Sequence, residues 1–329
     1  MSSPPLMSAI GLQDYIKTTA PLLSMLTQAQ LKRLQDADYR VFGPNKHSAV
    51  KLCHWCKQSI KTGEKKVCYK QLFYGIKSHR CLQMTPCLPL CNLRCTHCWR
   101  DHAYFRPKAE GPMDGARTVA EQSIEAQKNL LVGLGGTDHS EAHLKEAMEP
   151  TNAAISLDGE PTLYPYIGEL IAEYQKRRMT TFLVTNGMRP DVLEQLDPLP
   201  FQLYISLTSP DKTFFERTQH PIAPAGWDKL MQTLELLPSL KTRTVLRLTL
   251  AKDFNLDAVQ GFAKLVTKAN PMFIEPKAFM PIGASRSRLP FEAMPSHDEI
   301  IKFSEALANE TGYKLAGESK PSRVVLLKK

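Results

Sequence analysis

Six short apolar runs alternate with longer amphipathic segments through most of this 329-residue chain, and this alternation restricts its possible folds more than any other feature. The amphipathic segments, such as YIGELIAEYQKRR at residues 166–178, place apolar side chains on one helical face. Strand–helix alternation of this kind predicts a parallel sheet with right-handed crossovers. Six units favour an α/β fold built as an open, partial (β/α)6 TIM-type barrel over a closed eight-stranded one. The predicted strands are RCLQM at residues 80–84, and residues 153–157, 180–184, 202–207, 244–250 and 273–280.

The pattern divides the chain near residue 79. Residues 79–329 are predicted to form the barrel with a C-terminal extension, and the tail PSRVVLLKK is a candidate last strand. Residues 1–78 are predicted to form a helical and cysteine-rich N-terminal extension, because LLSMLTQAQLKRL carries one apolar helical stripe. The stripe contains Leu22, Met25, Leu26, Leu31 and Leu34.

Polar, turn-forming stretches follow the predicted strands. They read DGEPT, TNG, SLTSP, AKD and PIG, and a cysteine cluster follows the first strand. In barrels of this kind the chemistry lies at the C-terminal ends of the strands. We therefore expect the functional site in these loops.

All eight cysteines lie between residues 53 and 98, at positions 53, 56, 68, 81, 87, 91, 95 and 98. A chain of this length does not need disulfides to hold its core, and clustered thiols outside a disulfide framework more often bind metal. The last three, Cys91, Cys95 and Cys98, are spaced C-x3-C-x2-C just after the first predicted strand. Zinc fingers close their site with paired cysteines, whereas three thiolates on a four-iron cluster leave one iron open to a substrate or cofactor.

This triplet resembles that of the radical S-adenosylmethionine (SAM) superfamily, in which a ring such as His97 precedes the third cysteine. The resemblance implies a radical SAM type of barrel, a (4Fe-4S) cluster on the triplet and SAM on the open iron, as the source of a 5′-deoxyadenosyl radical. Asp158-Gly159-Glu160 resembles the family's glycine–glutamate motif for the cofactor's amino group, with Asp158 in place of the usual glycine. By the same resemblance, residues expected near the ribose and carboxylate of SAM are Asn186, Ser206 and Arg247.

Further motifs resemble the archaeal-type tRNA 4-demethylwyosine synthase family. They are AVKLCHWCK, VCYKQLFYGIKSHRCLQMTP, SLDGEPTLYP, FLVTNG, YISLTSP, VLRLTL and EPKAFMPIG. This resemblance implies a second (4Fe-4S) cluster held by three cysteines. Two of them are Cys68 and Cys81, and the first is Cys53 or, as the alternative, Cys56. Zinc bound by these four cysteines is the structural alternative. Cys87 is expected to be a buried cysteine without a ligand role.

The family resemblance also implies the reaction. Carbons C2 and C3 of pyruvate are condensed with N1-methylguanosine next to the anticodon of phenylalanine tRNA, which gives tricyclic 4-demethylwyosine. Lys70, two residues after Cys68, corresponds to the lysine that holds pyruvate as an imine. A methyl hydrogen on a purine has no usable acidity, so a radical is needed to activate it.

The charge of the chain is compatible with an RNA partner. Lysine and arginine exceed aspartate and glutamate by 42 − 33 = 9, and such a surplus attracts polyanions. Basic clusters such as KKVCYK, EYQKRR, ASRSR and KPSR are candidates for backbone contacts. No apolar run is long enough to span a bilayer and the N-terminus lacks the order of a signal peptide, which predicts a cytoplasmic protein, expected to be a monomer. The electron donor is expected to be a separate flavodoxin or ferredoxin.

Two other functions remain open at this point. Another radical SAM enzyme, such as a glycyl-radical activase or a peptide-modifying enzyme, would keep the cysteine triplet but would need neither Lys70 nor tRNA affinity. A zinc-containing RNA-binding module would keep the cysteines but would not cleave SAM.

Overall fold

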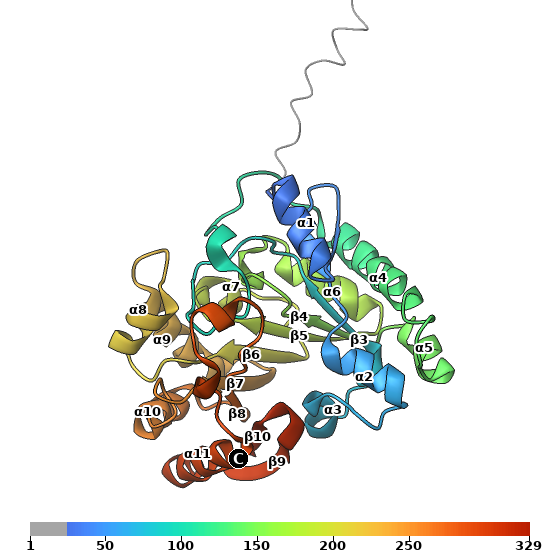
Figure 1. Cartoon of the computed structure of the whole chain (residues 1–329). Helices are drawn as coiled ribbons and strands as arrows, with labels where there is room; N and C mark the ends of the chain where they lie inside the picture. Colours follow the sequence, from blue (N-terminus) through green and yellow to red (C-terminus); the bar gives the residue numbers. More distant parts are fainter. Residues whose placement is uncertain (1–24) are drawn as a thin grey trace, which may run out of the picture.

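A computed structural model describes residues 25–329 and shows six parallel strands that follow one another in sequence order (Figure 1). Each predicted strand is found within a few residues of its expected position, and neighbouring strands pair in parallel along the whole series. The α/β fold with a partial (β/α)6 barrel is therefore confirmed. The six strands are β3 (Cys81–Thr85), β4 (Asn152–Ile155), β5 (Thr180–Thr185), β6 (Gln202–Ser206), β7 (Arg243–Leu250) and β8 (Phe273–Ala278).

Antiparallel strands extend the sheet at both edges, which brings it to ten strands among the described residues. At one edge, β2 (Ser48–Val50) pairs with β3, and β1 (Arg40–Phe42) pairs with β2. At the other edge, β10 (Val324–Lys328) pairs with both β8 and β9 (Lys314–Ser319). The expected strand in the C-terminal tail is β10. Strands β1, β2 and β9 were not predicted, because each carries only a short or weakly alternating apolar pattern.

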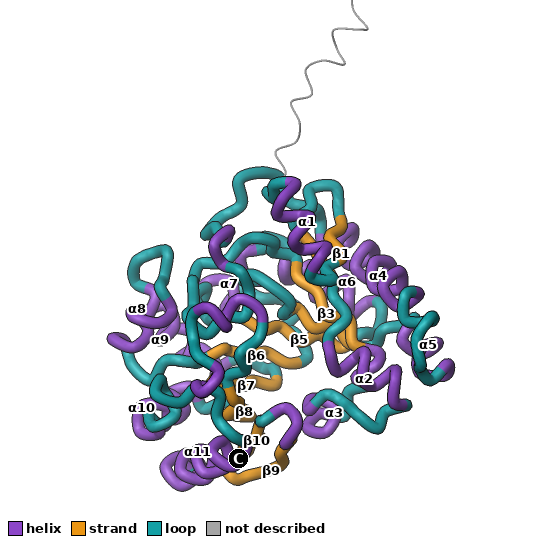
Figure 2. The backbone as a smooth tube through the Cα atoms, in the orientation of Figure 1, coloured by secondary structure: helices purple, strands orange, loops and turns teal. Residues whose placement is uncertain are grey.

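Helices between the parallel strands cover the outer face of the sheet (Figures 1 and 2). The segment predicted to be an amphipathic helix, residues 166–178, forms α6. The predicted inward face of α6 is confirmed, since Ile167, Leu170, Ile171 and Tyr174 are all buried. Burial of each such aliphatic side chain contributes about 1.5–3 kcal/mol. The helices between the parallel strands are α4 (Ala116–Val132), α5 (Glu141–Ala147), α6 (Ile167–Lys176), α7 (Pro190–Glu194), α8 (Lys212–Gln219), α9 (Gly226–Leu236) and α10 (Val259–Ala269). Helix α11 (His297–Thr311) follows the last parallel strand.

The N-terminal extension is helical but also contributes to the sheet. Helix α1 (Gln28–Asp36) begins at a capping box formed by Thr27 and Gln30. Met25 and Leu26 precede the helix and are buried. Leu31 and Leu34 lie within the helix and pack against the cluster that contains Leu26, and Leu22 lies outside the described residues. Two helices in the cysteine-rich segment were missed by the periodicity, α2 (His54–Thr62) and α3 (Tyr69–Tyr74). Through β2 and β3 the extension and the barrel share one continuous sheet.

Short 3-10 helices connect several of these elements. They are η1 (Ser78–Arg80), η2 (His102–Tyr104), η3 (Pro161–Leu163), η4 (Leu237–Ser239), η5 (Gly283–Ser287), η6 (Phe291–Ala293) and η7 (Lys320–Ser322). Within residues 25–329 no helix combines the length and the apolar character needed to cross a membrane.

Candidate active site

The cysteine triplet lies in the loop that follows β3, where the C-terminal ends of the parallel strands meet. The amide of Cys98 donates to the carbonyl of Cys95 at 3.1 Å, and this turn places two of the thiols on one short stretch of chain. Burial raises the pKa of all three thiols, and repulsion from a neighbouring thiolate raises the pKa of Cys91 and Cys95 further. A positive metal centre would remove both penalties, because thiolates bind metal in the deprotonated form.

Two distant parts of the chain hold the triplet loop in place. The amide of Thr96 donates to the carbonyl of Thr218 at 2.8 Å, at the C-terminal end of α8. The guanidinium of Arg288, just after η5, donates to the carbonyls of Thr96 (3.1 Å) and Cys98. Arg288 belongs to the ASRSR cluster, so in this structure one of the candidate tRNA-binding arginines binds the protein's own loop.

The loop after β4 lies directly against the segment that precedes the triplet. Gly159 has a φ of +66°, and an added Cβ would lie closer than 3.0 Å to the carbonyl oxygens of Cys87 and Leu90. Only glycine fits both requirements. The next amide, that of Glu160, donates to the carbonyl of Leu90 at 2.7 Å.

Asp158 stands where the superfamily motif usually has glycine, and its carboxylate has partners within the protein. It accepts from the amide of Gly159 at 2.8 Å and from the Tyr39 hydroxyl at 3.2 Å. The Arg100 guanidinium lies 3.8 Å away and donates to the Tyr39 hydroxyl as well. Burial raises the pKa of Asp158, while Arg100 opposes this shift. The sequence pattern did not single out Arg100, although it lies two residues after Cys98.

The buried carboxylate of Glu160 joins the loops after β4 and β5. It accepts from the hydroxyl of Thr162 and from that of Thr185, each at 2.6 Å, and from the backbone amide of Asn186 at 2.7 Å. The side-chain amide of Asn186 then donates to Asn92 in the triplet loop at 2.6 Å. Glu160 and Asn186, both predicted site residues, are thus in direct contact with each other and through Asn92 with the triplet loop.

His97 and Ser206 lie on the same side of the sheet end. The His97 ring is buried, which lowers its pKa to about 4 and keeps it neutral at physiological pH. Its Nε2 lies 3.4 Å from the hydroxyl of Thr208, two residues beyond Ser206. Ser206 is half-buried and ends β6, opposite Arg247 in the parallel register.

Lys70 lies in an aromatic pocket that the sequence did not predict. Its side chain is buried, and Nζ lies 4.9 Å from the ring centroid of Phe182 on β5 and 4.5 Å from that of Tyr204 on β6. Burial lowers the pKa of Lys70, and the nearby charge of Arg247 lowers it further. The five residues Lys70, Phe182, Tyr204, Arg247 and Glu275 are called the lysine pocket below.

Glu275, on β8, connects the parts of the lysine pocket. Its fully buried carboxylate accepts from the hydroxyls of Tyr69 (3.0 Å) and Tyr74 (2.7 Å) on α3, and from Nε of Arg247 at 3.0 Å. Within the described part of the chain, Nη2 of Arg247 is buried and has no hydrogen-bond partner. Among the described residues, the side-chain hydrogen bond of Arg247 is to Glu275, and the charges of both residues act on Lys70. The only signal for Glu275 in the sequence was a lone acid within a strand.

Three cysteines lie beside Lys70, two from the extension and one at the start of the barrel. Cys53 caps α2, Cys68 caps α3 and Cys81 begins β3, and we call them the cysteine trio. Burial raises the pKa of each thiol, that of Cys68 to about 11. Cys53 raises the pKa of the other two thiols further, whereas the charge of Lys70 lowers the pKa of all three. Such mutual effects require the thiols to be close to one another.

Cys56 and Cys87 are both fully buried. All three thiols of the cysteine trio raise the pKa of Cys56, so its thiol lies near them, but it faces a backbone carbonyl. The Cys56 thiol lies 3.6 Å from the carbonyl of His79 and packs, fully buried, among Leu52, Ile60 and Leu131. Cys87 is also fully buried in the main core, as expected for a cysteine without a ligand role.

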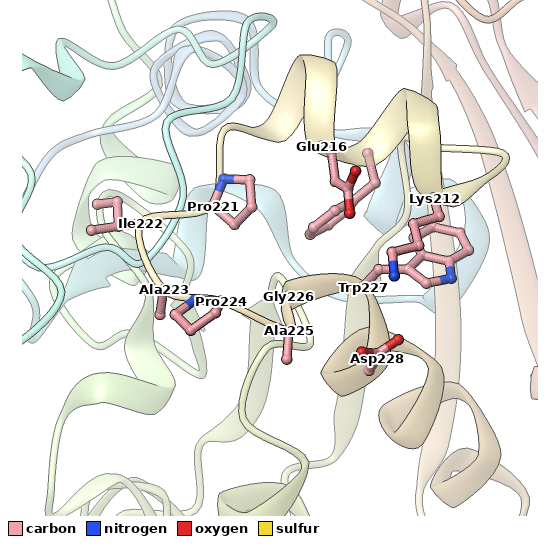
Figure 3. Close-up of a pocket in the computed structure, with 11 residues that line it drawn as sticks. Lys212, Glu216, Pro221, Ile222, Ala223, Pro224, Ala225, Gly226, Trp227 and Asp228 are labelled. Carbon is pink, nitrogen blue, oxygen red and sulfur yellow. The ribbon is translucent and has the colours of Figure 1, made fainter.

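A separate cavity of about 450 Å³ lies between α8 and α9 (Figure 3). Lys212 and Trp227 line one end and Ile222 the other, and none of its eleven lining residues is a predicted site residue. One lining residue contacts the triplet loop, since the amide of Ile222 donates to the carbonyl of Asn92 at 3.0 Å.

Comparison with known families agrees with this arrangement. Residues 85–266 match the model of the radical SAM superfamily and residues 268–329 match that of wyosine base formation. The fold and the site therefore define a radical SAM enzyme, a class that uses SAM and a (4Fe-4S) cluster. Within that class, the chain belongs to the tRNA 4-demethylwyosine synthase family.

The family assignment rests on relatives that match most of the chain. The S-adenosyl-L-methionine-dependent tRNA 4-demethylwyosine synthase of Pyrococcus abyssi is 48% identical over 88% of this chain and 85% of that protein. The enzyme of Methanocaldococcus jannaschii is 40% identical over 92% of this chain and 96% of that protein. A solved structure of TYW1 with a lysine-pyruvate adduct is 37% identical, with a TM-score of 0.83 over 92% of this chain and 96% of that one.

Proposed function

We propose that this enzyme condenses pyruvate carbons with N1-methylguanosine beside the anticodon of tRNA-Phe, with Lys70 holding pyruvate as an imine. The observation that carries the proposal is the placement of Lys70. It is a buried amine between two aromatic rings, next to the cysteine trio and to Arg247, whose Nη2 has no partner within residues 25–329. The lysine-pyruvate adduct named for the related TYW1 structure supports the same chemistry.

We assign Cys91, Cys95 and Cys98 to the SAM-binding cluster. Three buried or half-buried thiols with raised pKa values, held on a loop fixed at both ends, fit a donor set for a metal cluster. When bound, the cluster supplies the electron that cleaves SAM to the 5′-deoxyadenosyl radical. Residues assigned to hold SAM are Asp158, Gly159, Glu160, Asn186 and Ser206, which surround the same loop ends.

We assign the cysteine trio to a second (4Fe-4S) cluster and prefer Cys53 to Cys56 as its first ligand. Cys53 caps α2 beside Cys68 and Cys81, whereas the Cys56 thiol faces the His79 carbonyl among apolar side chains. A closed zinc site would need the fourth thiol. The direction of Cys56 therefore favours the three-cysteine cluster, which leaves one iron for a ligand other than protein.

Lys70 and Arg247 divide the binding of pyruvate between them in this proposal. The lowered pKa of Lys70 makes the neutral amine available to attack the keto carbon, with loss of water to give the imine. The guanidinium of Arg247 is fixed through Nε by Glu275, so Nη2 can donate to the pyruvate carboxylate. This role differs from the SAM carboxylate contact that the superfamily resemblance implied for Arg247.

The RNA and the electron donor complete the proposal. The name of the family implies tRNA as substrate, and the charge surplus of nine suits its phosphates. The target base must leave the loop stack to reach a buried site. We propose a separate flavodoxin or ferredoxin as reductant, a monomeric enzyme and a division of the chain into residues 1–78 and 79–329.

One assay tests the proposed function as a whole. The anaerobic enzyme with both clusters is supplied with SAM, pyruvate, reductant and tRNA-Phe that carries N1-methylguanosine, and the digested tRNA is analysed by mass spectrometry. We expect the tricyclic base to form only when pyruvate and the methylated tRNA are both present. Cleavage of SAM without the tricyclic base in the complete mixture would contradict the proposal.

A further inference from the structure

We propose that Glu64, His79 and His143 bind a divalent metal ion, zinc by the chemistry of the donors, at a site distinct from both cysteine groups. Two imidazole nitrogens and one carboxylate oxygen form a donor set that zinc favours. The three side chains come from the segment after α2, from η1 and from α5. The site is called the metal clip below. It does not depend on the function proposed above.

The ligand atoms are already close to one another. They all lie within 4.8 Å of each other, with His79 Nδ1 at 3.4 Å from Glu64 Oε1 and His143 Nε2 at 3.6 Å from Glu64 Oε2. Ligand atoms of a tetrahedral zinc ion are roughly 3.3 Å apart, as follows from zinc–ligand distances of about 2.0 Å. The ring centroids of His79 and His143 are 4.8 Å apart and the ring planes meet at 77°. The two ring edges can therefore face one ion without the rings stacking.

The second nitrogen of each ring has its own partner. His79 Nε2 lies 2.9 Å from Glu146 Oε2, and His143 Nδ1 lies 2.8 Å from the hydroxyl of Ser140. Metal-binding histidines generally use the non-coordinating nitrogen in this way, which fixes the tautomer and the ring orientation. The remaining nitrogens, His79 Nδ1 and His143 Nε2, are the two that face Glu64.

His79 Nδ1 gives independent support for a ligand. The side chain is fully buried, and among the described residues Nδ1 has no hydrogen-bond partner, because Glu64 is near but not in hydrogen-bonding geometry. A buried polar atom without a partner costs about 1–3 kcal/mol. A metal ion at the clip would satisfy this atom.

Two neighbours already contact the Glu64 carboxylate. Nε2 of Gln71 donates to Oε1 at 2.9 Å, and Nζ of Lys77 lies 3.4 Å from Oε2. Of these two neighbours, Lys77 carries a positive charge and Gln71 is neutral. About half of the Lys77 side chain is exposed, so it can turn to solvent when a metal ion neutralises the Glu64 carboxylate. Glu146 adds a second negative charge on the far side of His79.

The metal clip would brace the cysteine trio. Gln71 accepts from the amide of Ser78 at 2.8 Å, and the Ser78 hydroxyl accepts from the amide of Cys68 at 2.9 Å. A short chain of hydrogen bonds thus runs from Glu64 through Gln71 and Ser78 to one proposed cluster ligand. The clip also ties the extension to α5 on the outside of the barrel (Figure 1).

Zinc binding to the enzyme reconstituted with both clusters tests the clip. Zn²⁺ is titrated in competition with a chelator of known affinity, for the wild type and for His143→Gln, Glu64→Gln and the control His139→Gln. His139 lies in the same segment, four residues before His143, and is not part of the clip. We expect one zinc per wild-type and control chain, and binding at least tenfold weaker in the two clip variants.

X-ray absorption at the zinc edge identifies the ligands in the same samples. We expect a nitrogen and oxygen shell near ~2.0 Å with imidazole outer scattering, not sulfur near ~2.3 Å. Glu146→Gln, which keeps the fold but removes the charge behind His79, should weaken binding by about 10–100-fold. Equal affinity in His143→Gln and wild type, or a sulfur shell, would overturn the proposal.

Discussion

Arg247 donates from Nε to the buried carboxylate of Glu275 at 3.0 Å, and this contact fixes a guanidinium beside Lys70. Replacement Glu275→Gln should loosen that guanidinium, because a charge-assisted hydrogen bond contributes about 1.5–3 kcal/mol. We expect the pyruvate concentration for half-maximal trapping on Lys70 to rise about tenfold, which corresponds to about 1.4 kcal/mol. Iron content should stay unchanged and serves as the control for folding. An unchanged pyruvate requirement would contradict the role given to Arg247.

Cys53 and Cys56 should differ in their effect on iron content. With both proposed four-iron clusters in place, we expect about eight irons per chain. Cys53→Ser removes a proposed ligand, so we expect about four irons. The Cys56 thiol packs among apolar side chains, so Cys56→Ala should retain about eight irons with a modest loss of stability. Loss of the second cluster in Cys56→Ala alone would reverse the assignment.

Gly159→Ala tests the close approach of the loops after β3 and β4. The new methyl group would overlap the carbonyl oxygens of Cys87 and Leu90 at a positive φ, and such strain costs about 1–3 kcal/mol or more. We expect SAM binding to weaken at least tenfold. Gly136→Ala is the matched control, since an added Cβ there meets no atom within 4 Å. Equal SAM affinity in the two variants would show that the approach is not required.

Lys277 should make stability depend on pH. Burial, together with the nearby Arg247, lowers its pKa to about 8 from 10.5. Below pH 8 both the folded and the unfolded chain carry the charge. Between about pH 8 and 10.5 the folded state releases its proton first, so the stability contributed by this residue rises with pH. Because Lys277 is half-buried, water screens it, and we expect on the order of 1 kcal/mol.

Lys277→Met has no such titration. The thermal midpoint of the wild-type holoenzyme minus that of the variant should therefore increase by about 2 °C between about pH 7 and pH 10. The hydrogen bond from Lys277 to Ser322 affects both ends of this range and does not produce the trend. A difference that is flat or falls with pH would be incompatible with the lowered pKa.

The sequence predicted the barrel well because its strands are continuous apolar runs buried on both faces, which is a strong local signal. It did not predict α2 and α3, because both segments are short and mix charged, polar and aromatic residues with few aliphatic ones. The family resemblance pointed to Cys68, Cys81 and one of Cys53 and Cys56, but a sequence cannot say which of two neighbouring thiols faces a cluster.

The lysine pocket and the metal clip lay beyond sequence reasoning for another reason. Glu275 is more than 200 positions from Tyr69 and Tyr74, and His143 is 64 positions from His79. Contacts of this kind arise only when the sheet brings distant strands and helices together.

The most direct test of the account is to locate the carbon–nitrogen bond between pyruvate and the enzyme. The holoenzyme is incubated with pyruvate and borohydride without oxygen, and the labelled peptide is identified by mass spectrometry. We predict one adduct on Lys70 that is absent from Lys70→Ala and retained in Lys277→Met, whose amine in the wild type donates instead to the Ser322 carbonyl. An adduct of undiminished yield in Lys70→Ala, or one mapped to Lys277, would contradict the central claim.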